Sequence, residues 1–247
     1  MKAHRRHLFI PQNKENFMTG IIAAMPIEME LLTAEMKNKE TKTVSSITFT
    51  KGTLEGEEVV CAVCGVGKVF AAMCAQTMIM LYHPDCIINT GVAGSLSNDL
   101  NIGDIAISKF VVQHDMDTSP LGDPIGMISG INIVNIPADE KLYTAVKRAA
   151  EQIEDIQVVI GTIASGDCFV NDAQKKEFIK DSFGAISCEM EGAAIGHVCY
   201  VNEVPFCVVR SISDKADGSS HMDFPTFTRM AAKSSSSVIR NYLKLQK

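Results

Sequence analysis

Short apolar runs that alternate with helical patterns are the feature of this sequence that most constrains its fold. A chain that repeats this alternation forms strands buried inside a sheet and helices that cover it. We therefore predict one α/β domain. The strand-like runs are residues 19–24, 86–89, 158–164 and 205–212, and helical patterns follow at residues 26–36, 68–82, 138–154, 172–180, 190–201 and 224–245.

The composition narrows the classes of function. The chain has 247 residues and a formal net charge of −6, which argues against nucleic acid or an anionic membrane as the main partner because both require a basic face. Its apolar runs are shorter than the roughly 20 residues that span a bilayer. Residues 1–17 are polar and basic, and we expect a flexible N-terminal extension there, with the folded domain over residues 18–247.

The eight cysteines do not follow a disulfide or metal pattern. Cys61 and Cys64 have a CxxC spacing but fall within a strand-like run, whereas a redox pair of this kind begins a helix. A second close pair, which a zinc site needs, is missing. We expect free core thiols, no metal, no cofactor and a reducing cytoplasmic location; a thiol redox protein stays as an alternative.

Candidate ligand groups recur where a strand ends. In open α/β sheets this edge is where ligands bind. A single acid there can simply complement a helix dipole, and this structural alternative applies to Glu189 and Glu191 too. Three acids together with an aromatic residue and a glycine turn predict a pocket. The candidates at strand ends are Glu28, the turn at residues 91–94, Phe169, Glu191 and Asp214.

Carboxylates without a metal or a nucleophilic serine or cysteine point to acid/base catalysis, and glycosidic bond cleavage is its leading case. A glycine-rich turn at residues 65–68 precedes a helix, where backbone N–H groups favour anions. As a dinucleotide fingerprint it is weak, because it lacks the third glycine. The residues therefore favour an enzyme that acts on a glycoside.

Six short motifs share the order and spacing of a known family. The chain resembles the 5′-methylthioadenosine/S-adenosylhomocysteine nucleosidases, within the purine nucleoside phosphorylase superfamily, over residues 19–243. Each motif is weak alone, and their combination is highly specific. The resemblance implies a single-domain, three-layer α/β/α fold with a central mixed twisted sheet. The motifs are Gly20-Ile21-Ile22-Ala23-Ala24-Met25, Gly65-Val66-Gly67-Lys68, Asn89-Thr90-Gly91-Val92-Ala93-Gly94, Ser165-Gly166-Asp167, Glu189-Met190-Glu191 and Arg210-Ser211-Ile212-Ser213-Asp214.

The resemblance implies two catalytic residues. Asp214 would protonate N7 of the leaving adenine from a sheltered carboxyl group. Glu28 would orient and deprotonate the attacking water. Glu191 would accept hydrogen bonds from the ribose hydroxyls, and these bonds strengthen as the sugar becomes cationic.

The resemblance also implies a binding shell. Met190 would pack on the ribose, Phe169 would stack on adenine, and the backbone of Val170 would read the adenine edge. Arg210 would hold an acid in place, with a purely structural salt bridge as its alternative role. The remaining implied contacts with the substrate are Ala93, Gly94, Met25, Val66, Ser213, Phe224 and Glu189.

The loop after the first strand favours hydrolysis. Phosphorylases of this superfamily carry an arginine there to bind phosphate, whereas residues 24–28 contain Glu28 and no arginine. A carboxylate repels phosphate and activates water. The alternatives are a phosphate-dependent purine nucleoside phosphorylase, an aminodeoxyfutalosine nucleosidase and a non-catalytic nucleoside-binding protein.

Two departures from the family pattern concern substrate preference and assembly. Val92 stands where a small polar residue is common, and Leu121 stands where the family often has an aromatic residue that a neighbouring subunit lends to the pocket. The family's homodimer is expected here, with the apolar helix near residues 66–81 as the contact. A small nucleoside is the expected ligand, with no nucleic acid and no membrane as partner.

Overall fold

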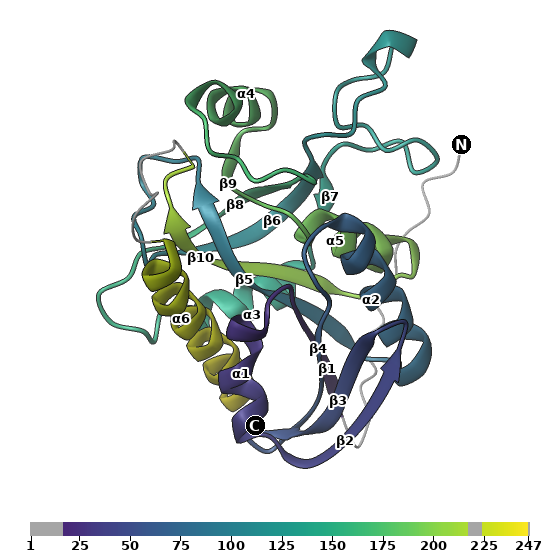
Figure 1. Ribbon diagram of the computed structural model, residues 1–247, viewed down its shortest axis with the longest axis vertical. Coiled ribbons are helices and arrows are strands. Elements are labelled where there is room, and N and C mark those ends of the chain that lie inside the picture. Colours follow the sequence, from purple (N-terminus) through teal and green to yellow (C-terminus); the bar gives the residue numbers. More distant parts are fainter. Residues whose placement is uncertain (1–16, 217–223, 247) are drawn as a thin grey trace.

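A mixed sheet of ten strands forms the centre of the fold in the computed structural model, which describes residues 17–216 and 224–246 (Figure 1). The strand order is β10-β6-β8-β9-β5-β1-β4-β3-β2, with β7 paired to β6. The elements are β1 (Met18–Ala23), α1 (Pro26–Glu35), β2 (Lys37–Val44), β3 (Ile47–Leu54), β4 (Glu57–Val63), α2 (Lys68–Tyr82), β5 (Cys86–Ser95), β6 (Ile105–Gln113), the 3₁₀ turn η1 (Ser119–Leu121), β7 (Ile136–Pro137), α3 (Glu140–Ala150), β8 (Val158–Ser165), α4 (Ala173–Phe183), β9 (Ala185–Glu189), α5 (Gly192–Val201), β10 (Phe206–Asp214) and α6 (Phe224–Lys244).

The sheet closes on itself around β5 and β10. β10 is parallel to β5 and antiparallel to β6, while β5 also meets β9 antiparallel at Gly94 and Ser95. β1, β4, β5 and β10 all run in the same direction. Their carboxyl ends therefore reach one edge of the sheet, where the ends of β8 and β9 also arrive.

Helices cover both faces of the sheet, which confirms the predicted three-layer α/β/α arrangement. α1, α3 and α6 pack together on one face, and α2 and α5 pack together on the other (Figure 1). Each face has its own buried apolar cluster. α4 lies beside the ends of β8 and β9, next to the edge where the strand ends meet.

Besides shifts of a few residues at several element ends, the structure departs from the sequence expectations at three places. β2 was not expected, because its side chains are polar and almost all exposed and so show no apolar alternation. α3 is shorter than predicted at both ends: it begins after Asp139, whose side chain caps it by accepting a hydrogen bond from the Leu142 amide at 2.8 Å, and it ends at Ala150. Residues 91–94 continue β5 instead of forming a turn, because β10 pairs with them.

Three further expectations concern the ends and the surface of the chain. β1 begins at Met18, and residues 1–16 of the predicted extension lie outside the described residues. Within the described ranges, none of the helices combines the length and the apolar character that a membrane span requires. Seven of the free cysteines are buried and Cys168 is partly exposed.

Candidate active site

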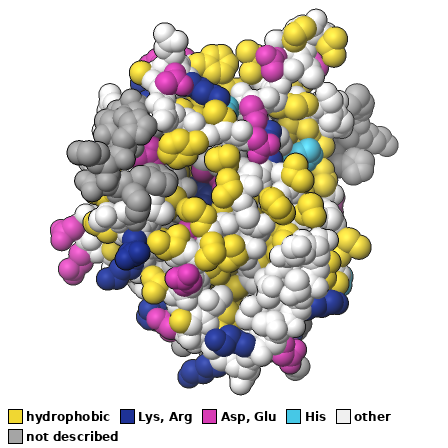
Figure 2. Space-filling model, in the orientation of Figure 1, with side chains coloured by type: hydrophobic (Ala, Val, Ile, Leu, Met, Phe, Trp, Pro, Cys, Tyr) yellow, Lys and Arg dark blue, Asp and Glu magenta, His cyan; other side chains and the backbone are white. Residues whose placement is uncertain are grey.

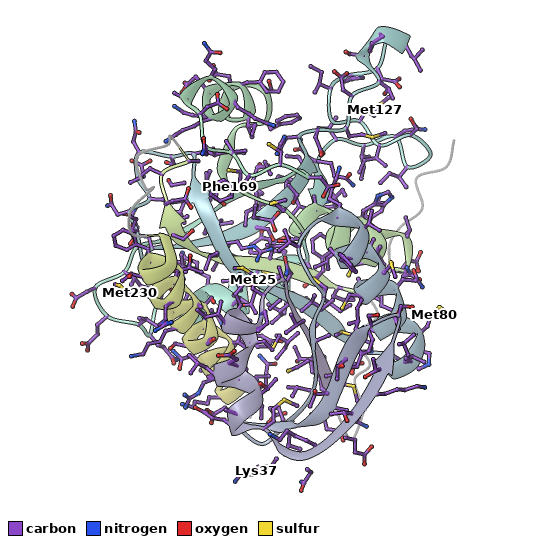
Figure 3. The ribbon with its side chains drawn as sticks, in the orientation of Figure 1. Met25, Lys37, Met80, Met127, Phe169 and Met230 are labelled. Atoms are coloured by element: carbon purple, nitrogen blue, oxygen red, sulfur yellow. The ribbon has the colours of Figure 1, made fainter. Side chains whose placement is uncertain are left out.

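A cavity of about 210 Å³ opens at the edge where the strand ends meet. Its walls come from the β1–α1, β4–α2 and β8–α4 connections, from the ends of β5 and β10, and from the β9–α5 junction. Figure 3 labels Met25 and Phe169, which belong to two of these walls. The lining residues are Ala24, Met25, Glu28, Val66, Val92, Ala93, Gly94, Cys168, Phe169, Val170, Cys188, Glu189, Met190, Glu191, Ser213 and Asp214.

Glu28 is almost completely buried, and backbone hydrogen bonds hold its carboxylate in one orientation. Its Oε2 accepts hydrogen bonds from the amides of Ala24 and Met25 at 3.0 and 2.8 Å, and its Oε1 accepts one from the Val92 amide at 3.0 Å. Burial raises the pKa of Glu28 above its ordinary value, and Arg210 and the three amides partly offset this rise. A fixed carboxylate with a raised pKa is suited to act as a general base.

Gly91 makes room for this arrangement. A Cβ atom at this position would lie 2.6 Å from Glu28 Oε1 and would also collide with the Arg210 guanidinium. Any residue other than glycine would therefore displace one of the two charged groups. The absence of a side chain lets the acid and the arginine approach the β5 backbone together.

Arg210 lies fully buried in the middle of the acids. Its Nη2 donates to Asn89 Oδ1 at 2.5 Å and forms a short ion pair with Glu189 Oε2. Burial opposes its charge, but Glu189, Glu191 and Glu28 outweigh this effect and raise its pKa. Its Nη1 and Nε have no hydrogen-bond partner among the described residues, so Nη1 keeps a donor beside Glu28.

Glu189 has a supporting position. Its Oε1 accepts a hydrogen bond from the Ser165 hydroxyl, and its Oε2 accepts from the amides of Glu191 and Gly192 at 3.0 and 2.7 Å as well as from Arg210. Glu189 thus accepts hydrogen bonds from the first amides of α5. This is a structural role at the start of a helix, which the sequence left open as the alternative to ligand binding. Both of its oxygens are engaged by the protein, although it borders the cavity.

Glu191 is held more loosely. Its Oε1 accepts one hydrogen bond, from the Gly67 amide at 2.8 Å, and its Oε2 lies 3.7 Å from Arg210 Nη2. Burial first, and then the negative charge of Glu189, raise the pKa of Glu191 to about 7, against the attraction of Arg210. Among the described residues, these contacts leave further acceptor positions of Glu191 without a partner, and the residue borders the cavity.

Asp214 ends β10 and is buried. Its Oδ2 accepts from the Ala216 amide at 3.0 Å, and its Oδ1 lies 2.8 Å from the Ser213 hydroxyl. The same hydroxyl is 3.4 Å from the Ala93 carbonyl oxygen. Because a hydroxyl carries one proton and two acceptor positions, Ser213 can donate to a charged Asp214 or accept from a protonated one.

Part of the cavity lining is apolar. Phe169 is 55% exposed, and Val170 beside it is buried. Met190 lies between the two glutamates in the sequence and also borders the cavity. A flat, apolar lining of this kind suits a heteroaromatic base.

The structure brings almost the whole predicted residue set to this one cavity. Arg210 lies behind the lining, as its predicted supporting role requires. Phe224 begins α6, but its side chain lies outside the described residues. Val92, within the predicted candidate segment 91–94, also lines the cavity. Sequence reasoning did not predict a ligand contact for Ala24, Cys168 or Cys188, which lie at or just beyond strand ends and also line the cavity.

Cys61 and Cys64 do not form a reactive pair. Both are free and buried, and burial raises the pKa of Cys61 to about 12 and that of Cys64 further still. A redox thiol needs the opposite, an accessible group with a lowered pKa. This geometry disfavours the thiol redox alternative.

Comparisons with known proteins place the chain in a family. Residues 19–244 match the family model of the phosphorylase superfamily. A 5′-methylthioadenosine/S-adenosylhomocysteine nucleosidase of Anoxybacillus flavithermus is 40% identical over 90% of this chain and 95% of its own length. The corresponding relative from Bacillus subtilis is 37% identical over 91% of this chain and 97% of its own length.

Comparisons with solved structures give the same family. The nucleosidase of this name from Neisseria meningitidis, in complex with methylthio-immucillin-A, has a TM-score of 0.89 and 34% identity, covering 92% of this chain and 99% of the other. The futalosine hydrolase of Helicobacter pylori has a TM-score of 0.87 and 34% identity, covering 93% of this chain and 98% of the other. The chain belongs to the phosphorylase superfamily and, within it, to the 5′-methylthioadenosine/S-adenosylhomocysteine nucleosidases.

Proposed function

We propose that this enzyme hydrolyses the N-glycosidic bond of 5′-methylthioadenosine and S-adenosylhomocysteine, releasing adenine and the 5-thioribose. The observation that carries this proposal is the convergence of Glu28, Glu191 and Asp214, all buried, on one cavity. The transition state of such a reaction has a cationic sugar and an adenine that needs a proton to leave. A charged carboxylate stabilises the cationic sugar, and a protonated carboxyl group supplies the proton for adenine.

Asp214 acts as the general acid. Protonation at N7 lets adenine leave as a neutral base, and the proton comes from the Asp214 carboxyl group. Ser213 can bond to this carboxyl in either protonation state, so the proton can move without breaking the contact. The backbone of Ala93 and Gly94 forms the adjacent wall.

Glu28 acts as the general base. Its three backbone hydrogen bonds fix the carboxylate plane, and its raised pKa makes it a better acceptor for the proton of water. The positive charge of Arg210 behind the lining favours the carboxylate form of Glu28 that accepts this proton. Attack then occurs on the face of the ribose opposite to adenine.

Glu191 stabilises the developing ribose cation. It accepts hydrogen bonds from the 2′- and 3′-hydroxyls, and its negative charge interacts most strongly in the transition state. Met190 packs on the sugar, and Phe169 stacks on adenine, with the backbone of Val170 at the adenine edge. Met25 and Val66 complete the apolar wall, and Glu189 and Arg210 support Glu191.

The lining favours water over phosphate as the nucleophile. Among the described lining residues none is a lysine or an arginine, whereas phosphate binding requires cationic groups. The test is adenine release from 5′-methylthioadenosine in phosphate-free buffer. We expect prompt release that added phosphate does not change, and release that appears only with phosphate would establish the phosphorylase alternative.

An aminodeoxyfutalosine nucleosidase is the second candidate, because the similarity to a futalosine hydrolase is nearly as high as that to the nucleosidase. The two candidates share adenine and ribose and differ in the 5′-substituent. Comparing kcat/KM for the three nucleosides in one preparation separates them. A value for aminodeoxyfutalosine that is far above the others would favour the second candidate.

We infer that the enzyme is a cytoplasmic homodimer. α2 exposes apolar side chains that a monomer would leave in water, among them Val69 at 70% and Met80 at 66% exposure. Figure 3 shows Met80 pointing away from the body of the protein, and Figure 2 shows hydrophobic side chains across this region of the surface. Leu121 is 83% exposed, which leaves it available for contact with a partner subunit. The eight free cysteines are typical of a protein of the reducing cytosol. The dimer is tested by analytical ultracentrifugation, which measures the mass of the particle in solution.

A further inference from the structure

A closed ring of hydrogen bonds at the protein surface joins the start of α2 to the loops that follow β6 and β8. The Lys68 amide donates to Asp167 Oδ1 at 2.7 Å, and the Asp167 amide donates to Asp115 Oδ2 at 2.9 Å. The Lys68 ammonium donates to Asp115 Oδ1 at 2.6 Å. These residues follow β4, β8 and β6, and none of the three borders the cavity. We call this arrangement the Lys68–Asp115–Asp167 ring.

The ring acts on the residue that holds Glu191. Gly67, which precedes Lys68, donates its amide to Glu191 Oε1 at 2.8 Å. Two consecutive amides are therefore held by two carboxylates, one in the ring and one in the cavity. Gly67 has a φ of 99°, in the region that favours glycine, and a Cβ there would lie 3.1 Å from Asp167 Oδ1.

An ion pair and a packing contact support the ring. Burial opposes the charge on Asp115, but the hydrogen bonds from Lys68 and the Asp167 amide outweigh it and lower the pKa of Asp115. The buried His114 ring lies against Gly166, where a Cβ would collide with it. This close contact restricts the position of the loop that carries Asp167. Charge-assisted bonds of this kind are stronger than neutral ones.

We propose that Asp167 is a positioning residue that sets the orientation of Glu191 through the Lys68 and Gly67 amides, and that it thereby determines how well the enzyme selects a ribonucleoside over a deoxynucleoside. The inference rests on the proposed role of Glu191 as acceptor of the ribose hydroxyls. Asp167 itself does not touch the substrate. Without it, the Lys68 amide loses its acceptor, and the neighbouring Gly67 amide that donates to Glu191 is held less firmly.

The experiment compares Asp167→Ala with Asp172→Ala. Asp172 is a matched control, because its side chain also accepts a hydrogen bond from a lysine amide at the start of a helix, Lys175 at 2.8 Å. The substrates are 5′-methylthioadenosine and its 2′-deoxy and 3′-deoxy counterparts. The intrinsic reactivity of each substrate cancels when the same ratio is compared between enzymes.

We expect Asp167→Ala to lower kcat/KM for the ribonucleoside by about 10- to 100-fold, the range for a small misplacement of a binding group. The deoxynucleosides should lose much less, so the selectivity ratio falls. Asp172→Ala should leave the ratio unchanged. Asp167→Asn keeps an acceptor for the Lys68 amide and should fall between the wild type and Asp167→Ala.

Equal losses for all three substrates in Asp167→Ala, or no loss, would overturn the inference. Failure of both Asp167 variants to fold would also overturn it, because Asp167 would then serve the fold and not Glu191. Glu191→Gln separates the two proposals. If the wild type shows no selectivity, or Glu191→Gln keeps it, the role of Glu191 fails; if Glu191→Gln loses selectivity and Asp167→Ala keeps it, only the present inference fails.

Discussion

Glu28 and Glu191 are both buried carboxylates that border the cavity and interact with Arg210, but the protein holds them differently. Glu28 accepts three backbone hydrogen bonds from two segments of the chain. Glu191 accepts one, from Gly67, and its second oxygen lies 3.7 Å from Arg210. The first acid is immobilised by the β1–α1 turn and β5. The second depends on a loop that precedes α2.

The difference corresponds to two chemical tasks. A carboxylate has about four acceptor positions, so three backbone donors leave Glu28 room for a single further partner, such as one water. Glu191 keeps several positions, which suits two hydroxyls of a ribose. The number of protein donors on a buried acid therefore indicates how many substrate groups that acid can receive.

The largest expected effect is that of Glu28→Gln. The amide group has one oxygen, so it cannot accept all three backbone hydrogen bonds, and it cannot take a proton from water. We expect turnover to fall by about 10²–10⁴-fold, the range for a positioned acid or base, while adenine binding persists. Steady-state kinetics and adenine titration measure both. Glu30→Gln, on the exposed side of α1, is the control and should keep full activity.

Asp214→Asn should lower turnover by a similar factor, about 10²–10⁴-fold, for the opposite reason. Asparagine can still bond to Ser213 and to the Ala216 amide, so the local structure survives, but it has no proton to give to N7. Binding of 5′-methylthioadenosine should persist, and calorimetry with this inactive variant measures it. Near-normal turnover would refute the assignment of Asp214 as the acid.

Glu191→Gln should have a smaller effect that depends on charge. We expect a transition-state analogue with a cationic sugar mimic to bind about tenfold or more weaker, because a buried charge–charge contact is lost. Adenine lacks the sugar and should bind almost unchanged. Competitive inhibition constants for the two ligands give the comparison, and an equal loss for both would contradict the role of Glu191 at the ribose.

Much of this fold could be predicted from the sequence. The buried strands, α1, α2 and the β9–α5 junction all have uniform apolar character or clear end signals. β2 could not be predicted, because a strand that is exposed on its residues 37–43 carries no apolar alternation. The path of β5 through residues 91–94 also escaped prediction, since glycines indicate a turn unless a partner strand pairs with them.

The sequence indicated which residues gather at the candidate site but not how they are arranged there. Acids at strand ends identified Glu28, Glu191 and Asp214, and the family resemblance supplied their expected roles, which stay predictions. Lys68 and Asp167 end two of the family motifs, but nothing in the sequence indicated that they bond to each other and to Asp115. The three residues are far apart in the sequence, and the closed sheet brings them together by bringing the ends of β4, β6 and β8 to one edge.

The smallest expected effect concerns stability and pH at Glu191. Burial and Glu189 raise the pKa of Glu191 from 4.5 to about 7. Between these values the folded protein holds a proton that the unfolded chain releases, so the contribution of Glu191 to stability falls as pH rises through this window. Glu191→Gln carries no charge at any pH and escapes this loss. Its melting temperature, relative to the wild type, should therefore increase from pH 5 to pH 8.

Glu189→Gln is the matched variant for this measurement. Glu189 makes the short ion pair with Arg210 and accepts the first amides of α5, so removing its charge leaves a buried arginine without its nearest partner. Breaking such a pair is strongly destabilising, and we expect Glu189→Gln to melt below the wild type at pH 8. If Glu191→Gln behaved in the same way, Glu191 would be a structural partner of Arg210, and the contrast between a fixed acid and an acid left available for substrate would no longer hold.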